Sequence, residues 1–142
     1  MAVNPADSEI FGALYGTDAM RAVFSDLALI RRLLEVEATL ARVQAELGII
    51  PAVAAAAIVR AATMERLDTA ALRESARLVG YPVLGVAKAL GNAAGPNAAR
   101  YVHWGATTQD IADSALVLQI RDGLTLLERD LRALVAALAE QA

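Results

Sequence analysis

An all-α fold is predicted by three features of the sequence. Hydrophobic residues make up 57% of the 142 residues but aromatic residues only 4%, so the core has to be built from small and aliphatic side chains. Such residues favour closely packed helices. Apolar residues recur at alternating spacings of three and four along two long segments, which is the period of one helical face. Helix-capping residues precede these segments, and we find no alternation that predicts a strand.

The N-terminal part is expected to form an irregular arm and one short helix. Residues 1–16 carry no helical period, and we expect Phe11 and Tyr15 to join this arm to the rest of the fold. Thr17 can cap a helix that continues to Phe24, because a threonine hydroxyl accepts hydrogen bonds from the free N–H groups of a first helical turn.

Two further helices are predicted before residue 64. Ser25 is a second capping signal, and the apolar stripe behind it predicts a helix of about six turns. The stripe consists of Leu29, Leu33, Val36, Leu40, Val43 and Leu47. Charged residues, Glu37 among them, are expected on the other faces. Gly48 stands where a left-handed residue commonly ends a helix. Pro51 can then open an alanine-dense, closely packed helix over residues 52–63.

Two shorter helices and a loop are predicted in the middle of the chain. Asp68 can cap a helix that ends near Gly80, a turn follows, and a short helix continues to about Leu90. Glycine, asparagine and proline at residues 91–97 mark a loop.

The last helix is predicted to begin at about Gln109 and to continue to the end of the sequence. Such a helix is roughly 50 Å long at ~1.5 Å per residue. A heptad-like apolar seam follows it. The seam consists of Val117, Ile120, Leu124, Leu127, Leu131, Leu134 and Leu138. Gly123 interrupts the helix at a cost of ~1 kcal/mol relative to alanine. Because no stop signal ends the helix, we expect the chain to be part of a longer protein.

Composition argues against several classes of protein. The formal net charge is −3 without a basic cluster, which argues against nucleic acid as a partner. The longest apolar stretch, residues 48–59, is too short to span a membrane, and no signal peptide precedes it. With no cysteine and one histidine there is no plausible set of metal ligands, and no cofactor is expected. The lack of cysteine fits a cytoplasmic location. The high apolar content predicts burial in an oligomer.

Residues 101–110 are the strongest candidate for a functional site. They hold the only histidine and the only tryptophan of the chain, next to two threonines and an acid. A polar loop that leads into a long helix presents free backbone N–H groups, and the helix dipole favours negative charge there. We therefore expect this loop to bind an organic anion, with a substrate carboxylate as the best fit.

The spacing of Thr107 and Asp110 is that of a capping box. The Thr107 hydroxyl can accept from the Asp110 N–H, and the Asp110 carboxylate can accept from the Thr107 N–H. The Thr108 hydroxyl, the Gln109 amide and the next free N–H groups then remain for a ligand. His103 lies just upstream, where it can donate to the same carboxylate or protonate a leaving group.

A purely structural interpretation explains the same residues. Capping boxes are common, so Thr107 can serve only as a cap while His103 packs under the loop with Trp104. Lys88 and Arg100 can point into one cleft and bind an anion, although solvated surface charge explains both. Residue types alone favour the structural interpretation.

The order of the residues in and around this loop favours the functional interpretation over the structural one. Residues 101–119 resemble the first signature region of the fumarase/aspartase superfamily, and within it the 3-carboxy-cis,cis-muconate cycloisomerases. Upstream, residues 19–26 and 35–42 resemble the opening helices of the superfamily. Residues 86–90 resemble the segment that precedes the signature. The resemblance thus extends over nearly the whole chain.

This resemblance implies an N-terminal helical domain over residues 1–108 and the first long helix of a central bundle over residues 109–142. It implies a homotetramer in which each active site gathers residues from three subunits. It also implies the reversible lactonisation of a tricarboxylate, 3-carboxy-cis,cis-muconate, in the protocatechuate (β-ketoadipate) branch of aromatic degradation. No nucleic acid, membrane or cofactor takes part.

By position in the signature, His103 and Thr108 are the predicted catalytic residues, and Asp110 holds the loop. The residues predicted to bind the substrate are Thr107, Thr108, Gln109 and Lys88. The superfamily's second histidine-bearing region and its mobile loop, thought to supply the base, have no counterpart in these 142 residues. We therefore expect the chain to be inactive alone.

Two alternatives remain at this stage. The first is another lyase of the superfamily, such as an adenylosuccinate lyase. That branch carries an Arg-His-Asp element before the signature, whereas residues 80–85 here contain no histidine. The second is a non-catalytic helical oligomerisation module whose signature loop serves only as a cap.

Overall fold

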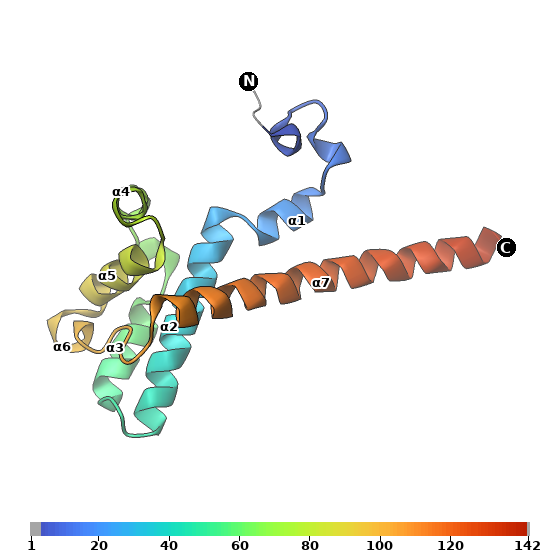
Figure 1. Cartoon of the computed structure of the whole chain (residues 1–142). Helices are drawn as coiled ribbons and strands as arrows, with labels where there is room; N and C mark the ends of the chain where they lie inside the picture. Colours follow the sequence, from blue (N-terminus) through green and yellow to red (C-terminus); the bar gives the residue numbers. More distant parts are fainter. Residues whose placement is uncertain (1–3, 142) are drawn as a thin grey trace.

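The computed structural model describes residues 4–141. All regular elements in this range are helical, which confirms the all-α prediction. The 3-10 helices are η1 (Pro5–Asp7), η2 (Gly12–Leu14) and η3 (Met64–Arg66). The α-helices are α1 (Asp18–Val23), α2 (Asp26–Glu46), α3 (Ala52–Ala61), α4 (Thr69–Val79), α5 (Val83–Ala94), α6 (Pro96–Ala99) and α7 (Thr108–Gln141). Helices α2 to α6 form a body from which the far half of α7 projects (Figure 1).

The predicted caps are present. The Thr17 hydroxyl accepts from the Met20 N–H at 3.2 Å, and the Ser25 hydroxyl accepts from the Ala28 N–H at 3.2 Å. The Asp68 carboxylate accepts from the first N–H groups of α4. Each bond satisfies a donor that has no partner within its own helix. The residues at which α1, α2 and α4 begin are thus set by the local sequence.

The predicted loop over residues 91–97 is wrong except at Gly95, because residues 91–94 belong to α5 and residues 96–97 to α6. Gly91 lies buried within α5, where a Cβ atom would meet the Ala99 Cβ at 3.6 Å. Close packing against the turn of α6 explains why a glycine stands inside this helix. The helix ends at Gly95, which has a φ of +90°, and Pro96 opens α6.

The N-terminal arm joins the fold through a residue other than those predicted. Phe11 and Tyr15 are 58% and 62% exposed. Instead, the Arg21 guanidinium of α1 donates to the Ala6 carbonyl at 2.8 Å and to the Gly12 carbonyl at 2.5 Å. A charged donor on two backbone carbonyls thus ties the arm to α1.

The hydrophobic core lies where α2 packs against α3 and α7. Its most deeply buried large side chains include Leu33 on α2, Ile58 on α3, Leu90 on α5 and Ile111 on α7. These residues come from four different helices. The core therefore fixes the start of α7 against the middle of α2.

Only the first half of α7 is packed against the body. Its buried residues recur at every fourth position: Ile111, Ala115, Gln119 and Gly123. The Gln119 amide donates to the Val23 carbonyl at 2.8 Å. Helix α7 continues through Gly123 without interruption. A Cβ atom at this position would come within 3.2 Å of the Phe24 ring. The glycine makes room for α1.

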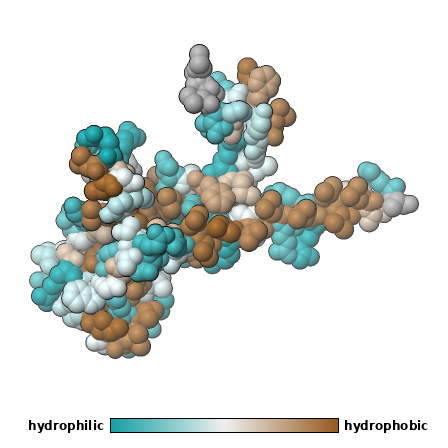
Figure 2. Space-filling model, viewed as in Figure 1, coloured by the Kyte–Doolittle hydropathy of each residue, from teal (hydrophilic) through white to brown (hydrophobic). Residues whose placement is uncertain are grey.

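The predicted apolar seam of α7 is exposed along its whole length. Its members, from Val117 to Leu138, are between 43% and 61% accessible. Brown apolar atoms mark this stretch along the projecting helix in Figure 2. Of the described residues after Gly123, none on α7 is buried. In residues 4–141, no helix combines the length and apolar character needed to cross a membrane.

Candidate active site

The loop between α6 and α7 contains an unusual backbone conformation at His103. Its φ is +59°, in the left-handed region that residues other than glycine rarely adopt. This conformation costs about 1 kcal/mol for a residue with a Cβ atom. Gly105, two residues later, also has a positive φ of +70°. The turn therefore needs interactions from outside the loop to keep His103 in place.

Glu37 on α2 supplies those interactions. Its side chain is 1% exposed, and it contacts two nitrogen atoms of the same residue. Oε2 accepts from the His103 backbone N–H at 3.1 Å, and Oε1 lies 2.5 Å from the His103 Nδ1. Nε2 lies on the opposite side of the ring, and no hydrogen-bond partner for it is found within residues 4–141. The His103 side chain is 24% exposed, so it remains partly accessible.

Gln44, two turns further along α2, makes a second contact to the loop. Its Nε2 donates to the Trp104 carbonyl at 2.7 Å. The Trp104 ring is half-exposed and tilts against the Tyr101 ring, with centroids 6.0 Å apart. Two buried polar side chains of α2 thus hold consecutive residues of the loop.

The capping box at the start of α7 is confirmed in part. The Thr107 N–H donates to Asp110 Oδ2 at 2.8 Å, as predicted. The Thr107 hydroxyl, however, accepts from the Gln109 N–H at 3.1 Å and not from the Asp110 N–H. Threonine caps reach either the second or the third helical N–H, and here the second is closer. Within the described chain, the N–H groups of Thr108 and Asp110 therefore have no partner.

The two other predicted ligands differ in their availability. Thr108 is half-buried at the first position of α7, and its hydroxyl makes no hydrogen bond to any described residue. The Gln109 amide contacts the Asp113 carboxylate one turn along the helix. One amide N–H of Gln109 stays available to a ligand. The Thr108 hydroxyl and the free backbone N–H groups at the start of α7 are therefore better donors for a ligand than the Gln109 amide.

Lys88 and Arg100 do not share a cleft, contrary to the hypothesis. Lys88 lines a hollow of about 410 Å³ that also includes Arg66 and Asp68. Arg100 lines a different hollow and lies 4.8 Å from the centre of the Tyr101 ring. Neither hollow includes any of residues 103–110. Lys88 therefore shares neither of these hollows with the His103 loop.

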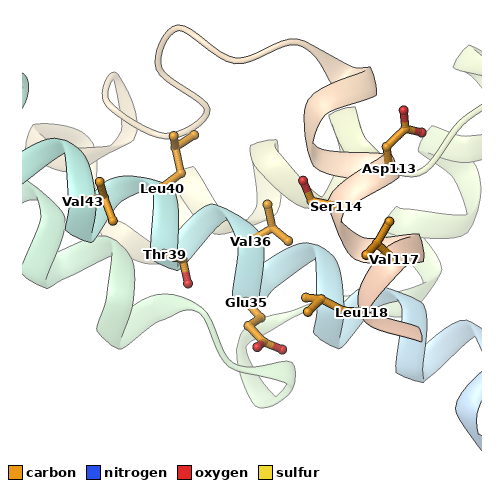
Figure 3. Close-up of a pocket in the computed structure, with 9 residues that line it drawn as sticks. All are labelled: Glu35, Val36, Thr39, Leu40, Val43, Asp113, Ser114, Val117 and Leu118. Atoms are coloured by element: carbon orange, nitrogen blue, oxygen red, sulfur yellow. The ribbon is translucent and has the colours of Figure 1, made fainter. Parts of the chain in front are cut away.

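An apolar groove of about 750 Å³ opens between α2 and α7, close to the loop (Figure 3). Val36 and Leu40 of α2 and Val117 and Leu118 of α7 surround it. Asp113 is its acidic member nearest the start of α7. None of the predicted site residues lines the groove.

Sequence reasoning missed Glu37 and Gln44. The apolar stripe predicts a polar face for Glu37, whereas it lies on the buried face with Leu33 and Ala41. The spacing of these three positions by four residues is the signal that could have found it. An acid inside a buried stripe needs a partner. The structure provides that partner at His103, 66 positions later.

The side chains around the loop are donors of hydrogen bonds to an anion. In the range 4–141, no three histidine, cysteine, aspartate or glutamate side chains cluster as ligands. The dominant features are instead a held histidine, a free hydroxyl and free N–H groups at the start of a long helix. This set of donors suits a carboxylate.

The fold and this site describe an all-α protein with an anion-binding helix start, and comparison with known proteins shows its family. The model of the family described as lyase matches residues 14–142, so the chain belongs to this lyase family. Over 138 residues it is 46% identical to a 3-carboxy-cis,cis-muconate cycloisomerase of Pseudomonas aeruginosa, with 95% of this chain and 30% of the relative covered. It is 45% identical over 125 residues to trans-aconitate decarboxylase 1 of Mycosarcoma maydis, with 88% and 25% covered.

Solved structures show the same relationship. A 3-carboxy-cis,cis-muconate lactonizing enzyme from Pseudomonas putida matches with a TM-score of 0.87 at 43% identity, covering 94% of this chain and 31% of that one. A fumarate lyase from Mesorhizobium sp. BNC1 matches with a TM-score of 0.85 at 48% identity, covering 89% and 30%. The resemblance inferred from the signature is confirmed. The chain spans about 30% of the length of the P. aeruginosa relative.

Proposed function

We propose that this chain supplies the amino-terminal part of a cycloisomerase that reversibly lactonises 3-carboxy-cis,cis-muconate. The observation that carries the proposal is the set of free donors at the start of α7, beside a histidine held by Glu37. Relatives from three further organisms carry the same cycloisomerase name, at 38% to 44% identity. Their similarity extends over the loop that holds these donors.

The reaction sets clear requirements on the site. A carboxylate oxygen of the substrate adds across a conjugated double bond, and the carbon alpha to another carboxylate gains a proton. The carboxylate next to that carbon takes on enolate character in between. Donors aimed at its oxygens stabilise that charge, and one such donor commonly contributes about 10²–10³-fold in rate. The Thr108 hydroxyl and the N–H groups of Thr108 and Asp110 are the proposed donors.

His103 and the remaining predicted ligands have supporting roles in this proposal. His103 has its Nε2 available to exchange a proton with the substrate, and Thr107 and Asp110 keep the first turn of α7 in shape. The remaining amide N–H of Gln109 can reach a second carboxylate oxygen. Lys88 contributes only through a charge at longer range, because it lines a separate hollow.

Assembly is part of the proposal. Residues 1–108 form the N-terminal domain, and residues 109–142 begin a central bundle shared by a homotetramer. The exposed seam of α7 supports this, since isolated apolar stripes of this length are rarely left in water. The aromatic-degradation pathway and a cytoplasmic location belong to the same proposal.

The test is a substrate panel on the longer protein that carries residues 1–142. We expect turnover of 3-carboxy-cis,cis-muconate, and at most weak turnover of adenylosuccinate, trans-aconitate or nitrosuccinate. The 142-residue chain by itself is expected to be inactive. If the protein turns over another member of the panel faster, that compound replaces 3-carboxy-cis,cis-muconate as the proposed substrate. The proposed carboxylate site is then retained. No turnover of any member by a correctly assembled protein would favour the non-catalytic oligomerisation module.

A further inference from the structure

Glu37 is a buried acid that contacts one residue through both of its oxygens. Its side chain is 1% exposed. Within the described residues, its hydrogen-bond partners are the backbone N–H and the ring Nδ1 of His103. Burying a carboxylate without compensation is costly, so both contacts have to be favourable. This requirement decides which ring nitrogen carries a proton.

The donors and acceptors at the contact between Glu37 and His103 indicate which ring nitrogen carries the proton. The backbone N–H of His103 is always a donor, and Oε2 of Glu37 accepts from it at 3.1 Å. As an ionised carboxylate, Glu37 only accepts, so the 2.5 Å contact between Oε1 and Nδ1 places a proton on Nδ1, whereas a protonated Glu37 would donate to Nδ1 and leave the ring proton on Nε2. In the neutral ring, Nε2 then carries a lone pair. In free imidazole in water, no contact fixes which of the two nitrogens carries the proton.

We infer that Glu37 is a positioning residue that keeps a proton on Nδ1 of His103 and makes Nε2 the atom that takes up and releases a proton. A proton arriving at Nε2 creates an imidazolium whose charge the Glu37 carboxylate offsets. When Nε2 returns that proton to the substrate or to water, the ring is neutral again and Nδ1–H is unchanged. The use of Nε2 on substrate depends on the proposed function, whereas the position of the proton on Nδ1 does not.

One substitution should invert the arrangement without changing its shape. Glu37→Gln retains a single oxygen, and the His103 backbone N–H requires it. The amide NH₂ then faces Nδ1, which has to accept, so the proton of the neutral ring moves to Nε2. Glu35→Gln is the matched control, because Glu35 lies on the same helix, is 48% exposed and pairs with Arg32.

The chain offers a direct spectroscopic readout. His103 is the only histidine among the 142 residues, so every imidazole signal of a tag-free, ¹⁵N-histidine-labelled sample belongs to it. Two-bond ¹H–¹⁵N correlation spectra at alkaline pH report which nitrogen is protonated. We expect the Nδ1–H form in the unaltered chain and in Glu35→Gln, and the Nε2–H form in Glu37→Gln. An Nε2–H form in the unaltered chain would overturn the inference, even if Glu37→Gln failed to fold.

Activity of the longer protein tests the second part. Glu37→Gln should lower kcat about a hundredfold, the usual range for losing one general acid–base group, with a smaller effect on KM. Glu35→Gln should leave kcat unchanged. Normal kcat in Glu37→Gln together with an inverted proton position would refute the role of Nε2. A longer protein without any lactonising activity would refute the proposed function and leave the proton assignment to the spectra.

Discussion

The Arg32 guanidinium on α2 contacts the Asp122 carboxylate on α7, 90 positions further along the chain. Arg32 also contacts Glu35 on its own helix at 2.5 Å. Asp122 precedes Gly123, the last buried residue of α7. The ion pair therefore marks where α7 leaves the body. The hydrogen bond from Arg32 is the main reason why the pKa of Asp122 lies below its ordinary value.

Replacing Asp122 by asparagine should lower stability at neutral pH. The pKa of Asp122 is lower in the folded chain than its ordinary value of 3.8, so its ionised form stabilises the fold above that pH. The contribution is lost as the pH falls below 3.8. Urea unfolding midpoints should thus differ at pH 7 and converge at strongly acidic pH. Asp130→Asn, on the projecting part of α7, is the control, and a difference independent of pH would contradict the assignment.

Because Leu33 on α2 is buried and Leu131 on α7 is exposed, the same substitution should cost very different amounts of stability at the two positions. Leu33→Ala removes a side chain that is 1% exposed and should cost about 2–5 kcal/mol of unfolding free energy. Leu131→Ala removes one that is 59% exposed and should cost less than about 0.5 kcal/mol in the dilute chain. Chemical denaturation measures both. Equal costs would show that α7 is packed differently. At high concentration, Leu131→Ala should also weaken self-association.

Gly123 predicts a size limit at the contact between α1 and α7. Alanine gains helix propensity of about 1 kcal/mol but crowds the Phe24 ring, so Gly123→Ala should lie within about 1 kcal/mol of the unaltered chain. Gly123→Leu cannot fit and should destabilise the packing by about 1–3 kcal/mol. Thermal unfolding tests the series. A stable Gly123→Leu chain would mean that α1 does not dock there.

Gln44 predicts the mobility of the site loop. Gln44→Ala removes the donor to the Trp104 carbonyl and should cost about 1–3 kcal/mol. Because Trp104 is the only tryptophan, its fluorescence anisotropy reports on the loop alone. We expect a lower anisotropy in Gln44→Ala. The exposed Glu46→Ala on the same helix serves as control, and an unchanged anisotropy in Gln44→Ala would argue that the loop is held otherwise.

Helix positions and their caps were predictable because they depend on neighbouring residues. Thr17, Ser25, Asp68 and Gly80 act as the local patterns indicate. The misplaced loop at Gly91 has the opposite cause. Its glycine serves contact with Ala99 across a turn, and propensity carries no information about such packing.

The site was predictable only in the part that lies in one segment. Thr107, Thr108 and Asp110 are neighbours in sequence, so their capping geometry follows from spacing. Glu37 and Gln44 reach the same loop from 66 and 60 positions away. Their role depends on how α2 packs on α7, which no local pattern contains.

The central claim is that the start of α7 binds a substrate carboxylate through donors that the fold itself does not use. Thr108→Val removes one such hydroxyl while keeping the shape of the side chain. In the longer protein we expect kcat/KM for 3-carboxy-cis,cis-muconate to fall about 10²–10³-fold with an unchanged unfolding midpoint. Thr125→Val, on an exposed turn of α7, should change neither quantity. Full activity in Thr108→Val would contradict the account.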